Sequence, residues 1–206
     1  MLDLGAEGDS AEARNWPVGP DDFDAMIDSK TFTNGSDKDA VKKLFRKMSI
    51  NQLGGIEKMI MHMMKPPTIE DARRFGGCLN LCHNVKELGL AACDMSDEAC
   101  KVMFSTLSSG ALAQLDWLQL SNNEIGDSGV KALADAVSSG ALASLKELRL
   151  RGNAIGDDGM KALADACASG ALAPGANVFL RGNNATETGK QAMNDAATAR
   201  GLGVFF

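Results

Sequence analysis

The sequence repeats itself with a period of 30 residues over three consecutive units. Residues 115–127, LDWLQLSNNEIGD, recur as residues 145–157, LKELRLRGNAIGD, and weaker copies surround Val85 and Val178. A further weak copy begins 29 residues before Val85, at Ile56, so we count about five units. A unit of this length is too short to bury its own hydrophobic face. The copies are therefore constrained to stack against one another in a row.

Each unit combines the pattern of a strand with that of a helix. In the clearest copy Leu118 and Leu120 alternate with polar residues, which is typical of a short strand with one buried face. Gly126 then takes the N-cap position of a helix, and an acidic residue follows it near the positive end of the helix dipole. Other units place Ser96, Gly156 and Thr186 at this N-cap position. Helical spacing predicts an inner stripe of small and apolar residues that packs on the sheet: Gly129, Ala132, Leu133, Ala136 and Val137.

An asparagine holds the same position in three units, at Asn123, Asn153 and Asn183. A side-chain amide donates and accepts hydrogen bonds at once. We therefore expect these residues to stack at one level and to satisfy turn backbone groups in neighbouring units.

These motifs resemble the leucine-rich repeat, L-x-x-L-x-L-x-x-[N/C]-x-L, and the helical second half of each unit looks like the ribonuclease-inhibitor-like subtype. The resemblance covers residues 56–206. The units are slightly long, because each carries a connector with a glycine at Gly110, Gly140 or Gly170. The resemblance implies an α/β fold, an open leucine-rich-repeat solenoid arc. Its parallel strands would lie on the concave face, the side of the sheet turned away from the helices, and its helices on the convex face.

The chain is expected to divide into three segments. Residues 1–35 form an acidic, largely extended leader, and residues 36–55 form a helical N-terminal cap. Residues 56–206 form about five repeats, which end in a strand around Val204 that echoes the strand around Val178.

The leader carries most of the net charge. Residues 1–40 hold ten acidic and three basic side chains, a net charge of −7, whereas residues 41–206 hold 17 acidic and 18 basic ones, a net charge of +1. A nearly neutral body offers no basic face for nucleic acid. We expect Trp16 and Phe23 to anchor the leader on a partner protein.

The chain shows no integral membrane segment, because no apolar run approaches the ~18 residues that a membrane span requires. It contains five cysteines, an odd number, and no secretory signal is recognisable before them. We therefore expect free thiols and a reducing intracellular location such as the cytoplasm.

No residue pattern points to catalysis, a cofactor or a metal site. The two histidines, His62 and His83, do not sit in the sequence context of a nucleophilic triad. Cys78, Cys82 and His83 lack the paired C-x-x-C spacing of a zinc site, so we favour buried thiols. The segment ending in Gly189-Lys190 departs from a phosphate-binding loop, since Asn and Gln replace its first Gly and its Ser or Thr.

The candidate binding residues are those that strand alternation directs to the concave face. Aromatic and arginine side chains gather on its C-terminal half, and these residue types are enriched in binding hot spots. The predicted partner-binding set is Trp117, Gln119, Glu147, Arg149, Arg151, Phe179 and Arg181, together with Trp16 and Phe23 of the leader. Ser121 is also expected on this face.

The sequence therefore predicts a non-catalytic protein-interaction module, an adaptor or a subunit of a larger assembly. One alternative is a regulator of an enzyme, an inhibitor or a GTPase activator, in which Arg151 or Arg181 would act on the partner. A second is a purely structural subunit held by its leader and caps. The sequence does not name the partner.

Overall fold

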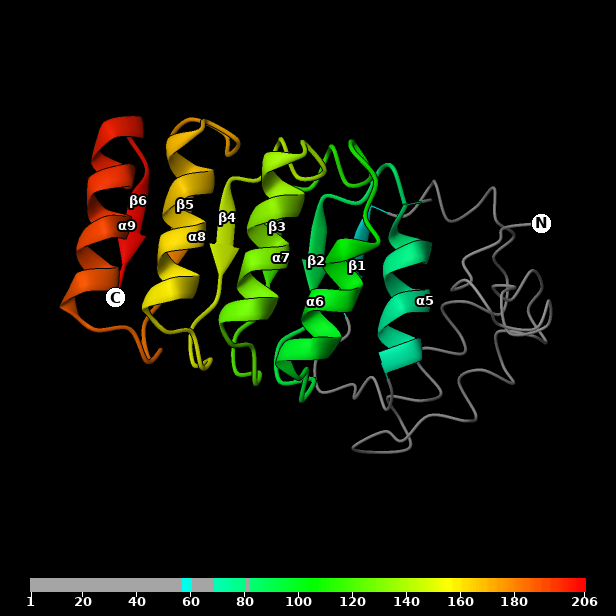
Figure 1. Cartoon of the computed structure of the whole chain (residues 1–206). Coiled ribbons are helices and arrows are strands. Elements are labelled where there is room, and N and C mark those ends of the chain that lie inside the picture. Colours follow the sequence, from blue (N-terminus) through cyan, green and yellow to red (C-terminus); the bar gives the residue numbers. More distant parts are fainter. Residues whose placement is uncertain (1–56, 61–68, 81) are drawn as a thin grey trace, which may run out of the picture.

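The structure, a computed structural model, describes residues 57–60, 69–80 and 82–206 of the chain. The expected leader and cap helix, with Trp16, Phe23 and His62, lie outside the described residues. Strands and helices alternate along the chain (Figure 1). The elements are β1 (Lys58–Ile60), α5 (Ile69–Leu79), β2 (Glu87–Gly89), α6 (Asp97–Ser105), β3 (Trp117–Gln119), α7 (Asp127–Ser138), β4 (Glu147–Arg149), α8 (Asp157–Ala168), β5 (Asn177–Phe179), α9 (Glu187–Arg200) and β6 (Gly203–Phe205).

The strands form one parallel sheet of six, arranged in chain order from β1 to β6. Equivalent positions of successive repeats are paired, and the middle residue of each of the first five strands is buried. The paired middle residues are Met59, Leu88, Leu118, Leu148, Val178 and Val204. This register matches the spacing in the sequence, including the weak first copy and the strand around Val204.

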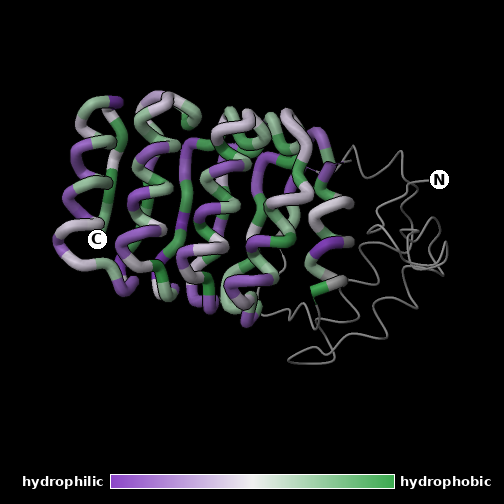
Figure 2. The backbone as a smooth tube through the Cα atoms, in the orientation of Figure 1, coloured by the Kyte–Doolittle hydropathy of each residue, from purple (hydrophilic) through white to green (hydrophobic). Residues whose placement is uncertain are grey.

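The helices are amphipathic and begin where the sequence predicts. Ser96, Gly126, Gly156 and Thr186 are the N-caps of α6 to α9. Hydrophilic and hydrophobic stretches alternate along each helix (Figure 2). All five residues of the inner stripe predicted for α7 are buried, so the helical period of the sequence identified the correct face.

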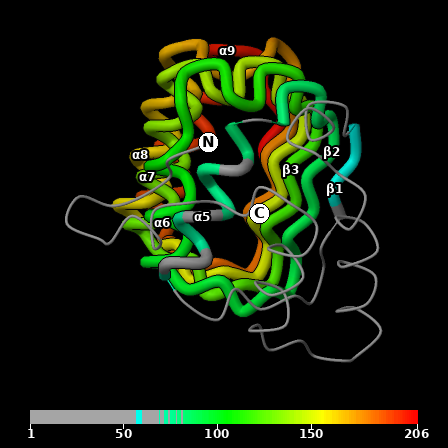
Figure 3. The backbone as a smooth tube through the Cα atoms, turned by 90° about the vertical axis from the view of Figure 1, so that its right-hand side faces the viewer, coloured from blue at the N-terminus to red at the C-terminus, as the bar shows by residue number. Residues whose placement is uncertain are grey.

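Helices and strands form two separate layers with the core between them, as the view along the stack shows (Figure 3). Each helix from α5 to α9 packs against the next. Because all the helices cover one face of the sheet, the other face remains free of helices. The predicted fold, an α/β leucine-rich-repeat solenoid, is confirmed.

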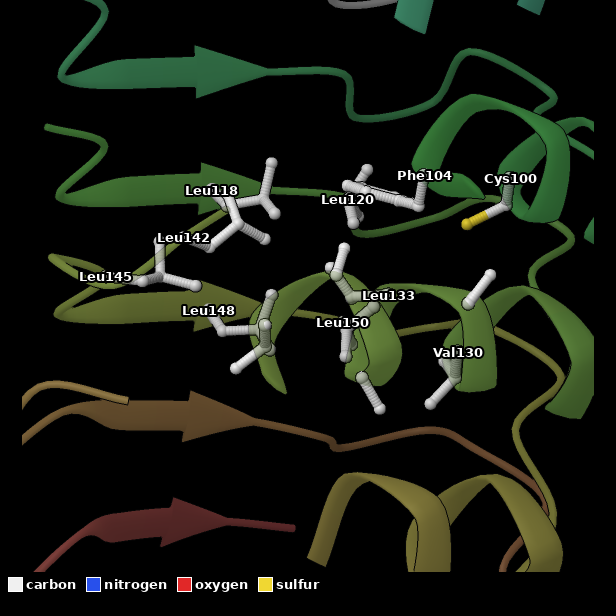
Figure 4. Packing of buried hydrophobic residues seen from close by; sticks show 14 of the residues in the cluster. Cys100, Phe104, Leu118, Leu120, Val130, Leu133, Leu142, Leu145, Leu148 and Leu150 are labelled. Carbon is white, nitrogen blue, oxygen red and sulfur yellow. The ribbon is translucent and has the colours of Figure 1, made fainter. Parts of the chain in front are cut away.

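The core is a set of leucine columns that continues from one repeat to the next. Leu118 and Leu148 lie in adjacent strands, and Leu120 and Leu150 follow them toward the helices (Figure 4). These four side chains are buried. The connectors close the other end of the core, with Leu142 and Leu145 fully buried and Gly140 at a φ of +82°, a conformation that favours glycine.

Asparagines join neighbouring repeats inside the turns, as the sequence predicts. The Asn153 side chain donates to the carbonyl oxygens of Leu120 and Leu150, both at 3.0 Å, and accepts from the Ile125 N–H at 3.2 Å. Asn123 and Asn183 make the same set of bonds in their own repeats. Each amide therefore satisfies backbone groups of two repeats at once.

Aspartates form a second set of links, which the sequence analysis did not predict. The Asp127 carboxylate accepts from the N–H groups of Gly156 and Gly159, at 2.6 and 3.0 Å, and both glycines belong to the next repeat. Asp97 and Asp157 do the same for the first turns of α7 and α9. Each aspartate thus caps the helix of the following repeat, in addition to favouring the dipole of its own helix.

The aspartate caps explain the glycine in the first turn of each helix. A Cβ on Gly159 would lie 2.6 Å from Asp127 Oδ1 and 2.8 Å from Ile155 Cγ2. Any side chain there would displace the carboxylate from the helix end.

We predict that Asn153→Ala destabilises the fold by about 1–3 kcal/mol, because it leaves buried backbone groups of two repeats without partners. Urea unfolding measures the change. The matched control is Asn184→Ala, an exposed residue of the next repeat, which should change stability by no more than about 0.5 kcal/mol. Equal losses in the two variants would contradict the role of the buried amide.

We also predict a pH dependence that arises from the cap on α9. The Thr186 hydroxyl and the Thr186 N–H, helped by the Gly189 N–H, lower the pKa of the Asp157 carboxyl against the opposing effect of desolvation. A lowered pKa in the folded state means that this carboxylate stabilises the fold above its unfolded pKa, about 3.9, and that its contribution is lost as the pH falls below that value.

The stability gap between the wild type and Asp157→Asn should accordingly shrink between pH 6 and pH 3. Urea midpoints at both pH values measure it. Asp158→Asn is the control, because it removes the same charge from the same helical turn at an exposed residue. A gap that shrinks equally in both variants would show that the cap is not its source.

Candidate functional site

The strand register arranges the residues of the concave face in two rows. One row runs Glu87, Trp117, Glu147, Asn177 and Gly203, and the other runs Gly89, Gln119, Arg149, Phe179 and Phe205. The residues between the rows point into the core. Five of the predicted site residues, Trp117, Gln119, Glu147, Arg149 and Phe179, therefore lie together on this face, and all five are half-buried.

Arg149 is the centre of this group. Its guanidinium carbon lies 5.6 Å from the centroids of both the Trp117 and the Phe179 rings, so the guanidinium stacks between two aromatic residues of neighbouring strands. Its Nε donates to the Glu147 carboxylate, which also accepts from Trp117 Nε1 at 3.1 Å. These bonds fix the orientation of Trp117 and Arg149 before any partner arrives.

The stack continues to the edge of the sheet. The rings of Phe179 and Phe205 lie parallel, with their centroids 4.7 Å apart and an interplanar angle of 13°. Phe205 is 47% exposed and Phe206 is 38% exposed. We call Trp117, Arg149, Phe179 and Phe205 the aromatic row.

Phe205 was not among the predicted site residues. It lies 26 residues after Phe179, whereas the period of the repeat is 30, so the simple period does not find it. The expected strand around Val204 was the available signal, since pairing Val204 with Val178 also pairs Phe205 with Phe179.

Arg151 and Arg181 lie beside the aromatic row, two residues beyond Arg149 and Phe179. Both are exposed, and neither guanidinium has an ion-pair partner within the described part of the chain. The other charges near this face are paired with one another: Lys58 with Glu87, Lys86 with Glu57 at 3.3 Å, and Lys146 with Asp116 at 3.0 Å. The positive charge of the concave face is therefore concentrated on its C-terminal half.

Ser121 does not lie where the sequence analysis placed it. It is 7% exposed, because the chain leaves the strand and turns inward beyond Gln119. Its N–H donates to the Gln119 side chain at 3.1 Å, and its carbonyl accepts from the Ala92 N–H at 3.0 Å. Ser121 is thus part of the turn and is not available to a partner.

The cysteines are placed as structural thiols. Cys82, Cys93, Cys100 and Cys167 are free and buried. Burial raises the pKa of the Cys167 thiol to about 12, and burial together with the nearby Asp97 charge raises the pKa of Cys100 further. These thiols are therefore protonated at neutral pH and are poor nucleophiles.

The described residues contain no group of three or more His, Cys, Asp or Glu side chains that is placed to hold a metal ion. Gly189 and Lys190, which end the rejected phosphate-loop match, lie in the first turn of α9, where the Gly189 N–H donates to Asp157. Within the same residues, no helix is both long and apolar enough to cross a membrane.

Comparison with known proteins bears on the repeat itself. Residues 118–134 and 141–164 match a family model described as a leucine-rich repeat. These segments begin in β3 and in the connector before β4, and they end within α7 and α8. The chain carries leucine-rich repeats.

Among solved structures, the leucine-rich-repeat chain is similar to an internalin from Listeria monocytogenes, at 15% sequence identity and a TM-score of 0.38. The match covers 76% of this chain and 43% of the internalin, so the chain spans less than half of that protein's length. A search of curated proteins found no match.

We predict that thiol titration returns five cysteines after denaturation without reductant and no more than one in the native protein. Burial of the four described thiols and the raised pKa of Cys100 and Cys167 block their reaction. Titration with a chromogenic disulfide reagent, with and without denaturant, measures both numbers. A denatured count of three or fewer would reveal a disulfide, and a native count of three or more would contradict the burial.

Proposed function

We propose that this protein is a non-catalytic interaction module, an adaptor or a subunit of a larger assembly. It binds a protein partner through the concave face, to which the leader with Trp16 and Phe23 contributes. The leucine-rich-repeat match supports a general role in protein binding. The unit length and the α-helix in every described repeat support the ribonuclease-inhibitor-like subtype.

The observation that carries this proposal is the aromatic row flanked by two unpaired arginines. The Glu147 carboxylate and the stacking hold Arg149 in place, so little side-chain entropy is lost when a partner binds beside it. Phe205 offers an exposed ring at the end of the row, and Arg151 and Arg181 offer free guanidinium groups. A pre-arranged aromatic surface with adjacent cations is a typical hot-spot composition.

The second candidate function, regulation of an enzyme, has one specific observation in its favour. Arg151 and Arg181 are exposed and unpaired within the described residues, as a guanidinium acting on a partner's active site would need to be. Neither residue is held by a neighbouring carboxylate or by aromatic stacking. A guanidinium that acts in a partner's active site needs a fixed position, so we favour binding over regulation.

We predict that Arg151→Glu combined with Arg181→Glu weakens partner binding about tenfold or more, which corresponds to at least about 1.4 kcal/mol. Thermal unfolding should stay unchanged, because both residues are exposed and make no ion pair within the described chain. Arg149 is unsuitable for this test, since its stacking and its bond to Glu147 support the fold itself.

Affinity capture from native extract followed by quantitative mass spectrometry identifies the partner, and titration of the purified pair measures binding. The matched control is Lys131→Glu with Lys161→Glu, which makes the same charge change on the exposed faces of α7 and α8. Loss of binding in the control alone would move the binding surface to the helices. Normal binding by both variants would exclude the arginines of the concave face.

A further inference from the structure

The concave face and the N-terminal leader are complementary in charge and in residue type. On the face, Arg151 and Arg181 are unpaired within the described chain and lie beside the exposed Phe205. In the leader, residues 16–28, WPVGPDDFDAMID, hold four aspartates, no basic residue and two aromatic rings.

We propose that residues 16–28 dock on the concave face of their own chain, over β4 to β6, and cover it until a protein partner displaces them. The Asp21 and Asp22 carboxylates pair with Arg151 and Arg181, and the Phe23 ring packs on the exposed end of the aromatic row. This inference rests on the proposed function, because it takes the same face as the binding surface. It adds a built-in competitor to that surface.

The charges on the face favour this one occupant. The acidic side chains in and just before the strands, Glu57, Glu87, Asp116 and Glu147, each have a cationic partner, so they do not repel an acidic segment as free charges would. The arginines are left over. A segment whose acidic residues have no basic neighbour within it supplies the missing anions in a charge-assisted form.

The connecting chain is long enough. The leader reaches the described part of the protein at Glu57, next to β1, and four strand spacings of about 4.8 Å separate β1 from β5, or about 19 Å. Between Asp28 and Glu57 lie 28 residues, which span at most about 3.3 Å each, or roughly 95 Å with the end bonds. A flexible tether of this length gives an effective concentration in the millimolar range, so a weak contact is sufficient for docking.

The test is hydrogen exchange of the full-length protein at low salt, with the amides of residues 16–28 as the readout. Docking should slow their exchange about tenfold, as expected for a segment whose own affinity is near 0.1 mM at a millimolar effective concentration. Arg151→Glu with Arg181→Glu should abolish this protection, and Lys131→Glu with Lys161→Glu should preserve it. Adding Asp21→Arg and Asp22→Arg to the first variant exchanges the charges and should restore the protection.

Three results would overturn the inference. The leader amides in the wild type exchange at the unprotected rate, or their protection survives Arg151→Glu with Arg181→Glu, or their protection disappears on tenfold dilution. Dilution sensitivity would assign the docked segment to a second copy of the chain.

Partner titration separates this inference from the proposed function. If the leader is unprotected but the arginine variant loses its partner, the docking fails and the binding function stands. If the leader follows the expected pattern but Asp21→Asn with Asp22→Asn exposes a face that binds its partner independently of Arg151 and Arg181, the docking stands and the concave-face function fails.

Discussion

No repeat of this protein can satisfy its own backbone. Asn153 holds carbonyl oxygens of two strands' turns and the N–H of Ile125, while Asp127 holds the first N–H groups of the helix that follows in the next repeat. Buried polar groups are costly when they lack partners, so these side chains make each repeat dependent on its neighbours. The parallel register, the depth of the core and the alignment of the concave face all follow from this sharing.

The fold was largely predictable because its signals recur. Leu118 and Leu148, Asn123 and Asn153, and the N-cap positions each repeat at 30 residues, so one interpretation of a unit could be checked in the next. The aspartate caps were missed for a physical reason. An acidic residue in a first helical turn already has a local explanation in the helix dipole, and nothing in the linear pattern shows that Asp127 Oδ1 reaches a backbone 29 residues away.

The candidate site was predictable in its membership and not in its geometry. Alternation placed Trp117, Arg149 and Phe179 on one face, but it does not specify rotamers, and the stacking of Arg149 between two rings depends on them. Ser121 failed because alternation ends with the strand, whose last residue is Gln119. The leader residues Trp16 and Phe23 remain predictions.

The aspartate caps give the stack a direction. Asp97 supports α7, Asp127 supports α8 and Asp157 supports α9, so the start of each of these helices is held by the repeat before it and never by the one after it. Damage to one of these side chains should loosen the helix downstream of the altered position. In this protein the place where a mutation is made and the place where its effect appears are therefore one repeat apart.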